Sequence, residues 1–194
     1  MTWLVAGLGN PGDKYRSTRH NAGAMVVELL AERAGERFRK ARFVPADVAE
    51  THMGGERVLL AKSHRFMNET GPSFASVAKK NSVPPEKLIA VHDEIDLPFG
   101  SLRVKQGGST AGHNGLKSLV SALRSEEFLR VRVGVGRPSG RGDPINYVLK
   151  PFSKDQLPDV PLLLDDAADA VESLIEKGLE RTQDTFNRRD RRDT

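Results

Sequence analysis

Residues 5–23, VAGLGNPGDKYRSTRHNAG, decide the fold, because they lead from a buried strand into a helix through a long polar loop. The apolar run at residues 2–8 predicts a short internal strand, and residues 7–12 then spell G-x-G-x-x-G, the spacing of a dinucleotide-binding turn. Such a turn needs its third glycine beside the start of a helix, so that the helix N-terminus meets the pyrophosphate. Here a Pro-Gly-Asp turn follows and the helix is expected only from about residue 21, so the motif does not indicate nucleotide binding.

The same loop carries two side chains suited to chemistry, Asn10 and His20. Glycine permits backbone paths that other residues do not, so we expect the glycines of residues 7–12 to let Asn10 approach a ligand closely. The loop then returns the chain to His20, which nucleotide binding does not require.

The composition is that of an ordinary globular protein. The chain has 194 residues, no cysteine and a formal net charge of +4. The lack of cysteine excludes disulfides, thiolate nucleophiles and zinc–thiolate sites, and it fits a reducing compartment. We expect a cytoplasmic protein, because the sequence shows neither a basic leader nor the run of roughly 20 apolar residues that a membrane span requires. No linker or repeat divides the chain, which predicts one domain over residues 1–194 with a flexible tail from about residue 180.

Strands and helices alternate along the sequence. Strands are expected at residues 2–8, in a hairpin that turns at Gly54-Gly55, and at residues 87–93, 101–106, 128–135 and 146–149. Helices are expected at residues 21–35, 72–81, 114–123 and 159–178. This alternation predicts a three-layer α/β/α sandwich around a mixed, mostly parallel sheet.

Polar residues gather on the segments that leave the predicted strands. They are Asn10, His20, Asn68, Asp93, His113 and Asn114. In α/β folds the ligand crevice lies at the carboxyl ends of the strands, so we expect these side chains to converge on one site.

A histidine, an aspartate and several amides suit the direct attack of water on an activated carbonyl. A neutral imidazole accepts the proton of the water, a carboxylate holds and stabilises the ring, and amides donate to the oxyanion. The sequence contains neither G-x-S-x-G nor H-E-x-x-H, so no serine nucleophile is indicated. Adjacent His92 and Asp93 should point to opposite sides of a strand, so no metal site is predicted either.

Four blocks resemble bacterial peptidyl-tRNA hydrolases in order and spacing, and the similarity extends over essentially the whole chain. They are residues 7–23, FMNETG at 66–71, VHDEIDLPFG at 91–100 and GGSTAGHNGLKS at 107–118. The resemblance implies a monomeric, cytoplasmic, single-domain esterase that cleaves the ester between a peptide and its tRNA and so releases the tRNA for reuse. It implies no cofactor, no metal, no membrane association and no obligate protein partner.

The resemblance also implies roles for individual residues. His20 is the catalytic base, Asp93 holds it in its basic form, and Asn10 distinguishes N-blocked from free aminoacyl-tRNA. The residues that bind substrate or tRNA are Tyr15, Phe66, Met67, Asn68, Asn114, His113, Arg103, Lys105 and Arg132. Among these, the amides lie near the scissile carbonyl, the aromatic rings contact the tRNA end or the peptide, and the basic residues meet tRNA phosphate. His113 either orients Asn114 or only caps the helix that follows.

Two other readings stay open at this point. The basic runs at residues 36–42, 129–141 and 188–192 are either solvated faces or a surface that contacts phosphate groups. The first alternative to an enzyme is a catalytically silent RNA-binding module that would use this basic surface. The other reading is a nucleotide-dependent enzyme, which a failure to bind NAD or ATP would exclude.

Overall fold

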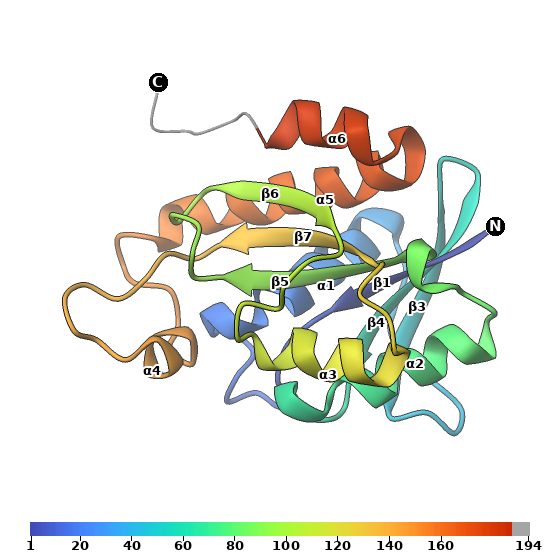
Figure 1. Cartoon of the computed structure of the whole chain (residues 1–194), viewed down its shortest axis with the longest axis horizontal. Coiled ribbons are helices and arrows are strands. Elements are labelled where there is room, and N and C mark those ends of the chain that lie inside the picture. The colour runs from blue at the N-terminus through green and yellow to red at the C-terminus, as the bar shows by residue number, and fades with distance from the viewer. Residues whose placement is uncertain (188–194) are drawn as a thin grey trace.

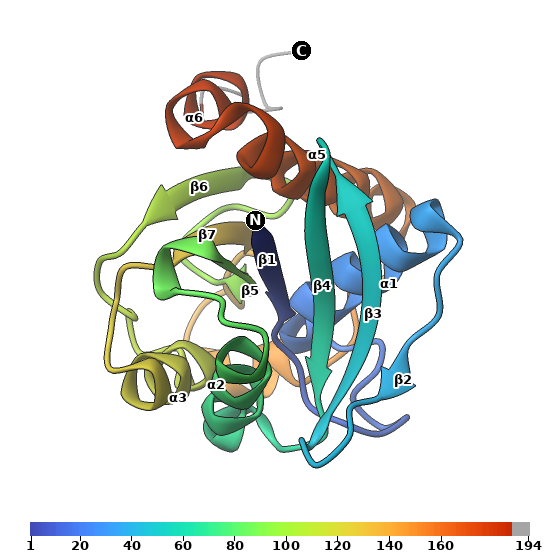
Figure 2. The ribbon, with the colours of Figure 1, turned by 90° about the vertical axis from the view of Figure 1, so that its right-hand side faces the viewer.

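The computed structural model describes residues 1–187. A sheet of seven strands, in the order β2-β3-β4-β1-β5-β7-β6, forms the middle layer, with α2 and α3 on one face and α1 and α5 on the other (Figure 1, Figure 2). The strands are β1 (Thr2–Gly7), β2 (Arg39–Lys40), β3 (Ala46–Met53), β4 (Glu56–Ser63), β5 (Leu88–Glu94), β6 (Leu102–Gln106) and β7 (Leu129–Gly134). The helices are α1 (Ala22–Ala34), α2 (Gly71–Lys80), α3 (Asn114–Leu123), α4 (Pro144–Val148), α5 (Val160–Lys177) and α6 (Leu179–Phe186). The predicted three-layer sandwich is confirmed.

The sheet is mixed. The neighbours β4, β1, β5 and β7 pair in parallel, and only β3 and β6 run against the other strands. The carboxyl ends of the parallel strands therefore meet at one edge, where a ligand crevice is expected. The sheet buries one apolar cluster against α1 and α5 and a second against α2 and α3.

Two glycines let α1 lie directly on the sheet. A Cβ atom on Gly23 would lie 1.9 Å from the Val91 carbonyl oxygen, and one on Gly7 would lie 2.6 Å from the Gly23 carbonyl oxygen. No other residue fits at either position. Gly7 thus serves helix–strand packing, whereas the sequence suggested that the glycines of this loop bring Asn10 to a ligand.

The prediction of a short strand at residues 146–149 is wrong, because this segment lies in α4 and directly after it. Asp143 accepts a hydrogen bond from the Ile145 N–H at 3.0 Å, and Pro144 occupies the first helical turn, where its missing N–H costs nothing. The two-residue strand β2 has too little pattern to be seen in the sequence.

The stretch Leu179–Phe186, at the start of the tail expected from about residue 180, is helical. This stretch forms α6, which packs on β6 and buries Thr182 and Phe186. The basic run at residues 188–192 lies outside the described residues. Within residues 1–187, no helix is long and apolar enough to cross a bilayer.

Candidate active site

His20 and Asp93 come from distant parts of the chain and meet at the carboxyl edge of the sheet. His20 lies in the 3-10 turn Arg19–Asn21 that precedes α1, and Asp93 lies near the end of β5. The His20 Nδ1 atom is 3.0 Å from Asp93 Oδ1 and 2.9 Å from Asp93 Oδ2. The Asp93 side chain is 2% exposed and that of His20 is 14% exposed. The pair therefore turns Nδ1 of His20 inward and leaves its Nε2 for a ligand.

Arg19 fixes the turn that carries His20. Its buried guanidinium lies 3.8 Å from the centre of the Tyr147 ring and donates to the Tyr147 carbonyl oxygen at 2.9 Å. A further hydrogen bond of 2.9 Å reaches Gln156 Oε1. No pattern in the sequence indicated this role, because all the partners of Arg19 come from beyond residue 145.

His113 is a second partner of Asp93. Its Nδ1 accepts hydrogen bonds from the Gly115 and Leu116 N–H groups at 3.1 and 3.3 Å, so Nδ1 carries no proton. The proton therefore sits on Nε2, which donates to Asp93 Oδ1 at 2.8 Å. The sequence left open whether His113 orients Asn114 or caps a helix; it caps α3, and the same geometry aims an N–H at Asp93.

The shared hydrogen bonds set the ionisation of the pair. Burial by itself disfavours the charged ring of His20, but the charge and the hydrogen bond of Asp93 outweigh it and raise the pKa of His20. Burial likewise opposes ionisation of Asp93, and the two histidines overcome it and lower the pKa of that carboxyl. Asp93 is therefore a carboxylate that accepts two N–H groups.

His92, next to Asp93 on β5, does not line this site. Its Nδ1 donates to the Asp93 carbonyl oxygen at 2.8 Å, and burial lowers the pKa of His92 to about 3, so its ring is neutral. The expected alternation of side chains along the strand is confirmed, and it keeps the adjacent histidine out of the pocket.

His20 and Asp93 line a pocket of about 290 Å³, which is called the His20 pocket below. The three amides predicted from the sequence, Asn10, Asn68 and Asn114, all line it. Asn10 Oδ1 accepts a hydrogen bond from the Met67 N–H at 2.8 Å, so the Asn10 amide NH₂ group remains for a ligand. Three amide side chains thus line the same pocket as His20.

Asn21 holds Asn10 in place. Its Oδ1 accepts from the Asn10 N–H at 2.8 Å, and its Nδ2 donates to the Asn10 carbonyl oxygen at 2.9 Å. Asn21 precedes α1, but its side chain makes no capping hydrogen bond to that helix. A Cβ on Gly9 would lie 2.9 Å from the Asn21 side chain, so the glycine makes room for this clamp.

An apolar wall closes the other side of the His20 pocket. It comes from α4 and the residue after it, chiefly Ile145, Val148 and Leu149. Ile145 is 67% exposed, which leaves a large apolar side chain facing solvent beside the polar centre. The sequence missed this wall, because the segment was assigned to a strand.

Tyr15 and Phe66 lie edge to face, with their ring centres 6.1 Å apart. They join the loop that follows Asn10 to the loop that precedes Asn68, and Phe66 is exposed. Met67 is buried and lines the His20 pocket. The structure thus brings Met67 to the site, whereas the two aromatic rings stand beside it.

The predicted basic residues lie on the edge strand β6 and on β7, the strand beside it. Arg103 and Arg132 are cross-strand partners, and Arg132 Nη2 donates to Glu94 Oε1 at 2.6 Å. Burial first, and then the charges of Arg132 and Arg130, lower the pKa of Lys105. These cations lie beside the His20 pocket rather than in it, and Glu94, which lines the pocket, connects the two.

Arg130 supports the loop that carries His113 and Asn114. It is fully buried, and its two terminal nitrogens donate to the Ser109 and Gly108 carbonyl oxygens, each at 2.7 Å. The sequence showed Arg130 only as one member of a basic run. Its burial, which no local pattern reveals, distinguishes it from Arg132, which is partly exposed, and from Arg137, which is exposed.

His20, Asp93 and His113 also form a cluster whose three ligand atoms lie within 4.8 Å of one another. A cation there would need the Nε2 lone pair of His113. That nitrogen carries the proton as long as Nδ1 accepts the two backbone N–H groups of α3. The donor set fits a hydrogen-bonded relay better than a metal.

A family model described as peptidyl-tRNA hydrolase matches residues 4–194 of the chain. A relative from Frankia alni is 52% identical over 185 residues, which cover 95% of this chain and 93% of that protein. A relative from Nocardia farcinica is 50% identical over 184 residues, with 95% of each chain covered. Both carry the name peptidyl-tRNA hydrolase.

Among solved structures, the crystal structure of peptidyl-tRNA hydrolase from Acinetobacter baumannii superposes with a TM-score of 0.89. The two sequences are 30% identical, and the match covers 96% of this chain and 95% of that one.

Proposed function

This chain belongs to the peptidyl-tRNA hydrolase family and hydrolyses peptidyl-tRNA, and from that premise we propose that His20 is the general base of the reaction. The observation that supports this role is the His20–Asp93 pair, with the second ring nitrogen of His20 facing a pocket lined by three amides. A neutral imidazole in that position accepts a proton from the attacking water. Asp93 stabilises the imidazolium that results.

The proposed reaction balances without a further reactant. The water oxygen bonds to the ester carbonyl carbon while one water proton passes to Nε2 of His20. The carbon–oxygen bond to the terminal ribose of the tRNA then breaks. The proton returns from the imidazolium to the ribose oxygen, so the products are a peptide acid and free tRNA.

The amides of the pocket have two proposed roles. Asn68 and Asn114 donate hydrogen bonds to the carbonyl oxygen as it becomes negative. Asn10 donates to the carbonyl of the first peptide unit, a group that free aminoacyl-tRNA lacks. A site built to hydrogen-bond such a group discriminates against a substrate without it.

Asn10→Asp tests this selectivity. An aspartate keeps an oxygen that accepts from the Met67 N–H but loses the donor and adds a charge that attracts a free ammonium group. We expect the ratio of kcat/KM for N-acetylaminoacyl-tRNA over free aminoacyl-tRNA to narrow by roughly 3- to 10-fold. The assay is run with a chelator present, and hydrolysis by the wild type under that condition excludes a metal requirement. An unchanged ratio contradicts the role of Asn10.

We propose that the cations of β6 and β7 hold the tRNA phosphates. Arg103, Lys105 and Arg132 crowd together, and a phosphate that lies among them relieves their mutual repulsion. We also propose that the enzyme acts as a monomer without an obligate protein partner. Peptidyl-tRNA forms where translation takes place, so we also propose a cytoplasmic location.

Salt dependence tests the phosphate contacts. Lys105→Gln should reduce the slope of log KM against log salt by roughly 0.7–0.9, because one counterion fewer is released on binding. Lys177→Gln, at the end of α5 on the opposite face of the sheet, removes the same charge and should leave the slope unchanged. Equal slopes in the Lys105 variant and the wild type would count against this surface.

A further inference from the structure

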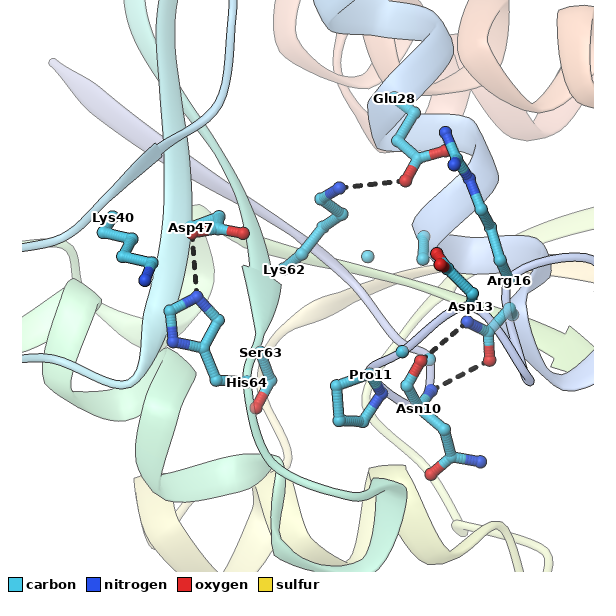
Figure 3. Close-up of a pocket in the computed structure, with 15 residues that line it drawn as sticks. Asn10, Pro11, Asp13, Arg16, Glu28, Lys40, Asp47, Lys62, Ser63 and His64 are labelled. Atoms are coloured by element: carbon cyan, nitrogen blue, oxygen red, sulfur yellow. Dashed lines mark hydrogen bonds and ion pairs between the residues drawn. The ribbon is translucent and has the colours of Figure 1, made fainter.

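A second, larger pocket lies on the other side of Asn10. It measures about 620 Å³ and lies between the Gly9–Arg16 loop, the first half of α1 and the adjoining ends of β2, β3 and β4 (Figure 3). Lys62 Nζ forms an ion pair with Glu28 at 2.9 Å, and His64 Nε2 forms a hydrogen bond with Asp47 Oδ1 at 2.8 Å; both contacts border the pocket. This Lys62 pocket is of a size typical for ligand sites, and the reaction described above leaves it unused.

The two pockets share one wall. Asn10 lines both, and Figure 3 shows its side-chain amide pointing away from Lys62 and Glu28. Its backbone is fixed by Asn21, and its Oδ1 binds the Met67 N–H. A peptide that contacts the Asn10 amide and continues past this fixed residue therefore reaches the Lys62 pocket.

The order of the strands places the two halves of the substrate. The cations of β6 and β7 lie on one side of the β1–β5 centre that carries His20 and Asp93, and the Lys62 pocket lies on the other, over β4, β3 and β2. An ester held at His20 sends its tRNA half and its acyl half in different directions. With the tRNA on the β6–β7 side, the acyl half points across Asn10.

The charge of the Lys62 pocket argues against a phosphate ligand. Three carboxylates and three cationic side chains line it: Asp13, Glu28, Asp47, Arg16, Lys40 and Lys62. A phosphate-binding surface has an excess of cations, as the β6–β7 edge does. A balanced lining rich in donors and acceptors suits neutral peptide groups, which offer one N–H and one C=O per residue.

We propose that the Lys62 pocket binds the part of the nascent peptide that lies N-terminal to the first peptide unit of the substrate. This rests on the proposed role of His20 at the ester, and it makes the enzyme sensitive to peptide length. Contacts in this pocket are available only to substrates with more than one amino-acid residue, and a single N-acetylated residue ends at Asn10.

Filling or stripping the pocket tests the proposal. Lys40→Trp fills the exposed rim, and the double variant Glu28→Ala/Lys62→Ala removes an ion pair without leaving a lone charge. Each is assayed on N-acetylaminoacyl-tRNA and on tRNA that carries a pentapeptide. We expect kcat/KM for the pentapeptide substrate to fall by roughly 3- to 10-fold per lost hydrogen bond, with the acetylated substrate unaffected. The control Lys177→Trp makes the same change far from the pocket and should affect neither substrate.

A fall of equal size on both substrates, or no fall on either, overturns the proposal. Measurements on the wild type distinguish a failure of this proposal from a failure of the proposed function. Hydrolysis of the acetylated substrate by the wild type, and its loss in His20→Ala, depend on the His20 pocket alone.

A cross-link locates the peptide without relying on variants of the pocket. The His20→Ala protein is mixed with peptidyl-tRNA that carries a photoreactive group at the peptide N-terminus. Labelling of Gly9–Arg16 or of residues 62–64 supports the proposal. Labelling confined to the apolar wall at Ile145 and Leu149 shows that the peptide leaves by way of α4, and overturns it.

Discussion

His20→Ala lowers kcat for peptidyl-tRNA hydrolysis by about 10²- to 10⁴-fold, the usual contribution of a general base, and leaves tRNA affinity unchanged. The expected size follows from the geometry: the His20 pocket retains its three amides and loses only the group that accepts the proton of the water. The tRNA phosphates are held elsewhere, on β6 and β7. Single-turnover rates and equilibrium binding of uncharged tRNA measure the two quantities separately.

The same variant separates catalysis from tRNA binding, because it removes the proposed base and leaves the cations of β6 and β7 in place. His52→Ala provides the matched control, because His52 is an exposed histidine on β3 far from the pocket. Wild-type rates in the His20 variant would remove this residue from the mechanism.

Asp93→Asn is expected to reduce kcat by an amount on the order of 10²- to 10⁴-fold although it removes no atom that touches water. The cause lies in His113, whose Nε2–H is fixed by the cap of α3 and must donate to position 93. The asparagine carbonyl oxygen then faces His113, and its NH₂ group faces Nδ1 of His20. That nitrogen must become an acceptor, so the proton of the ring moves to Nε2, which can no longer accept one.

The pH profile gives Asp93→Asn a signature that a loss of stability would not produce. The neutral form of His20 is the base, so activity rises with pH through the pKa of that residue. Asp93 raises this pKa, and its neutralisation therefore moves the rising limb of kcat to lower pH while the plateau falls. If the plateau of kcat falls but the rising limb of the pH profile stays at the same pH, the variant has damaged folding rather than removed the partner of His20.

Much of the fold follows from local patterns. Apolar runs, Pro72 near the start of α2 and Gly35 at the end of α1 act over a few residues, and the structure confirms the elements they predicted. The exception at α4 is instructive. The short segment at residues 146–149 is compatible with a strand as well as a helix, and the Asp143-Pro144 start decided in favour of a helix.

The site was predicted in part for a different reason. Residues at the carboxyl ends of parallel strands converge whatever the details of packing, so His20, Asp93 and the three amides could be grouped in advance. Arg19 and Arg130 could not, because their roles depend on burial and on partners distant in the chain.

Short-range periodicity and the direction of the strands were sufficient to predict the α/β architecture and the polar residues at its carboxyl edge. The order of the strands, the sharing of Asp93 by two histidines and the second pocket beyond Asn10 were decided by the tertiary structure alone. Each of these depends on contacts between residues far apart in the chain, whose free energies no local stretch contains.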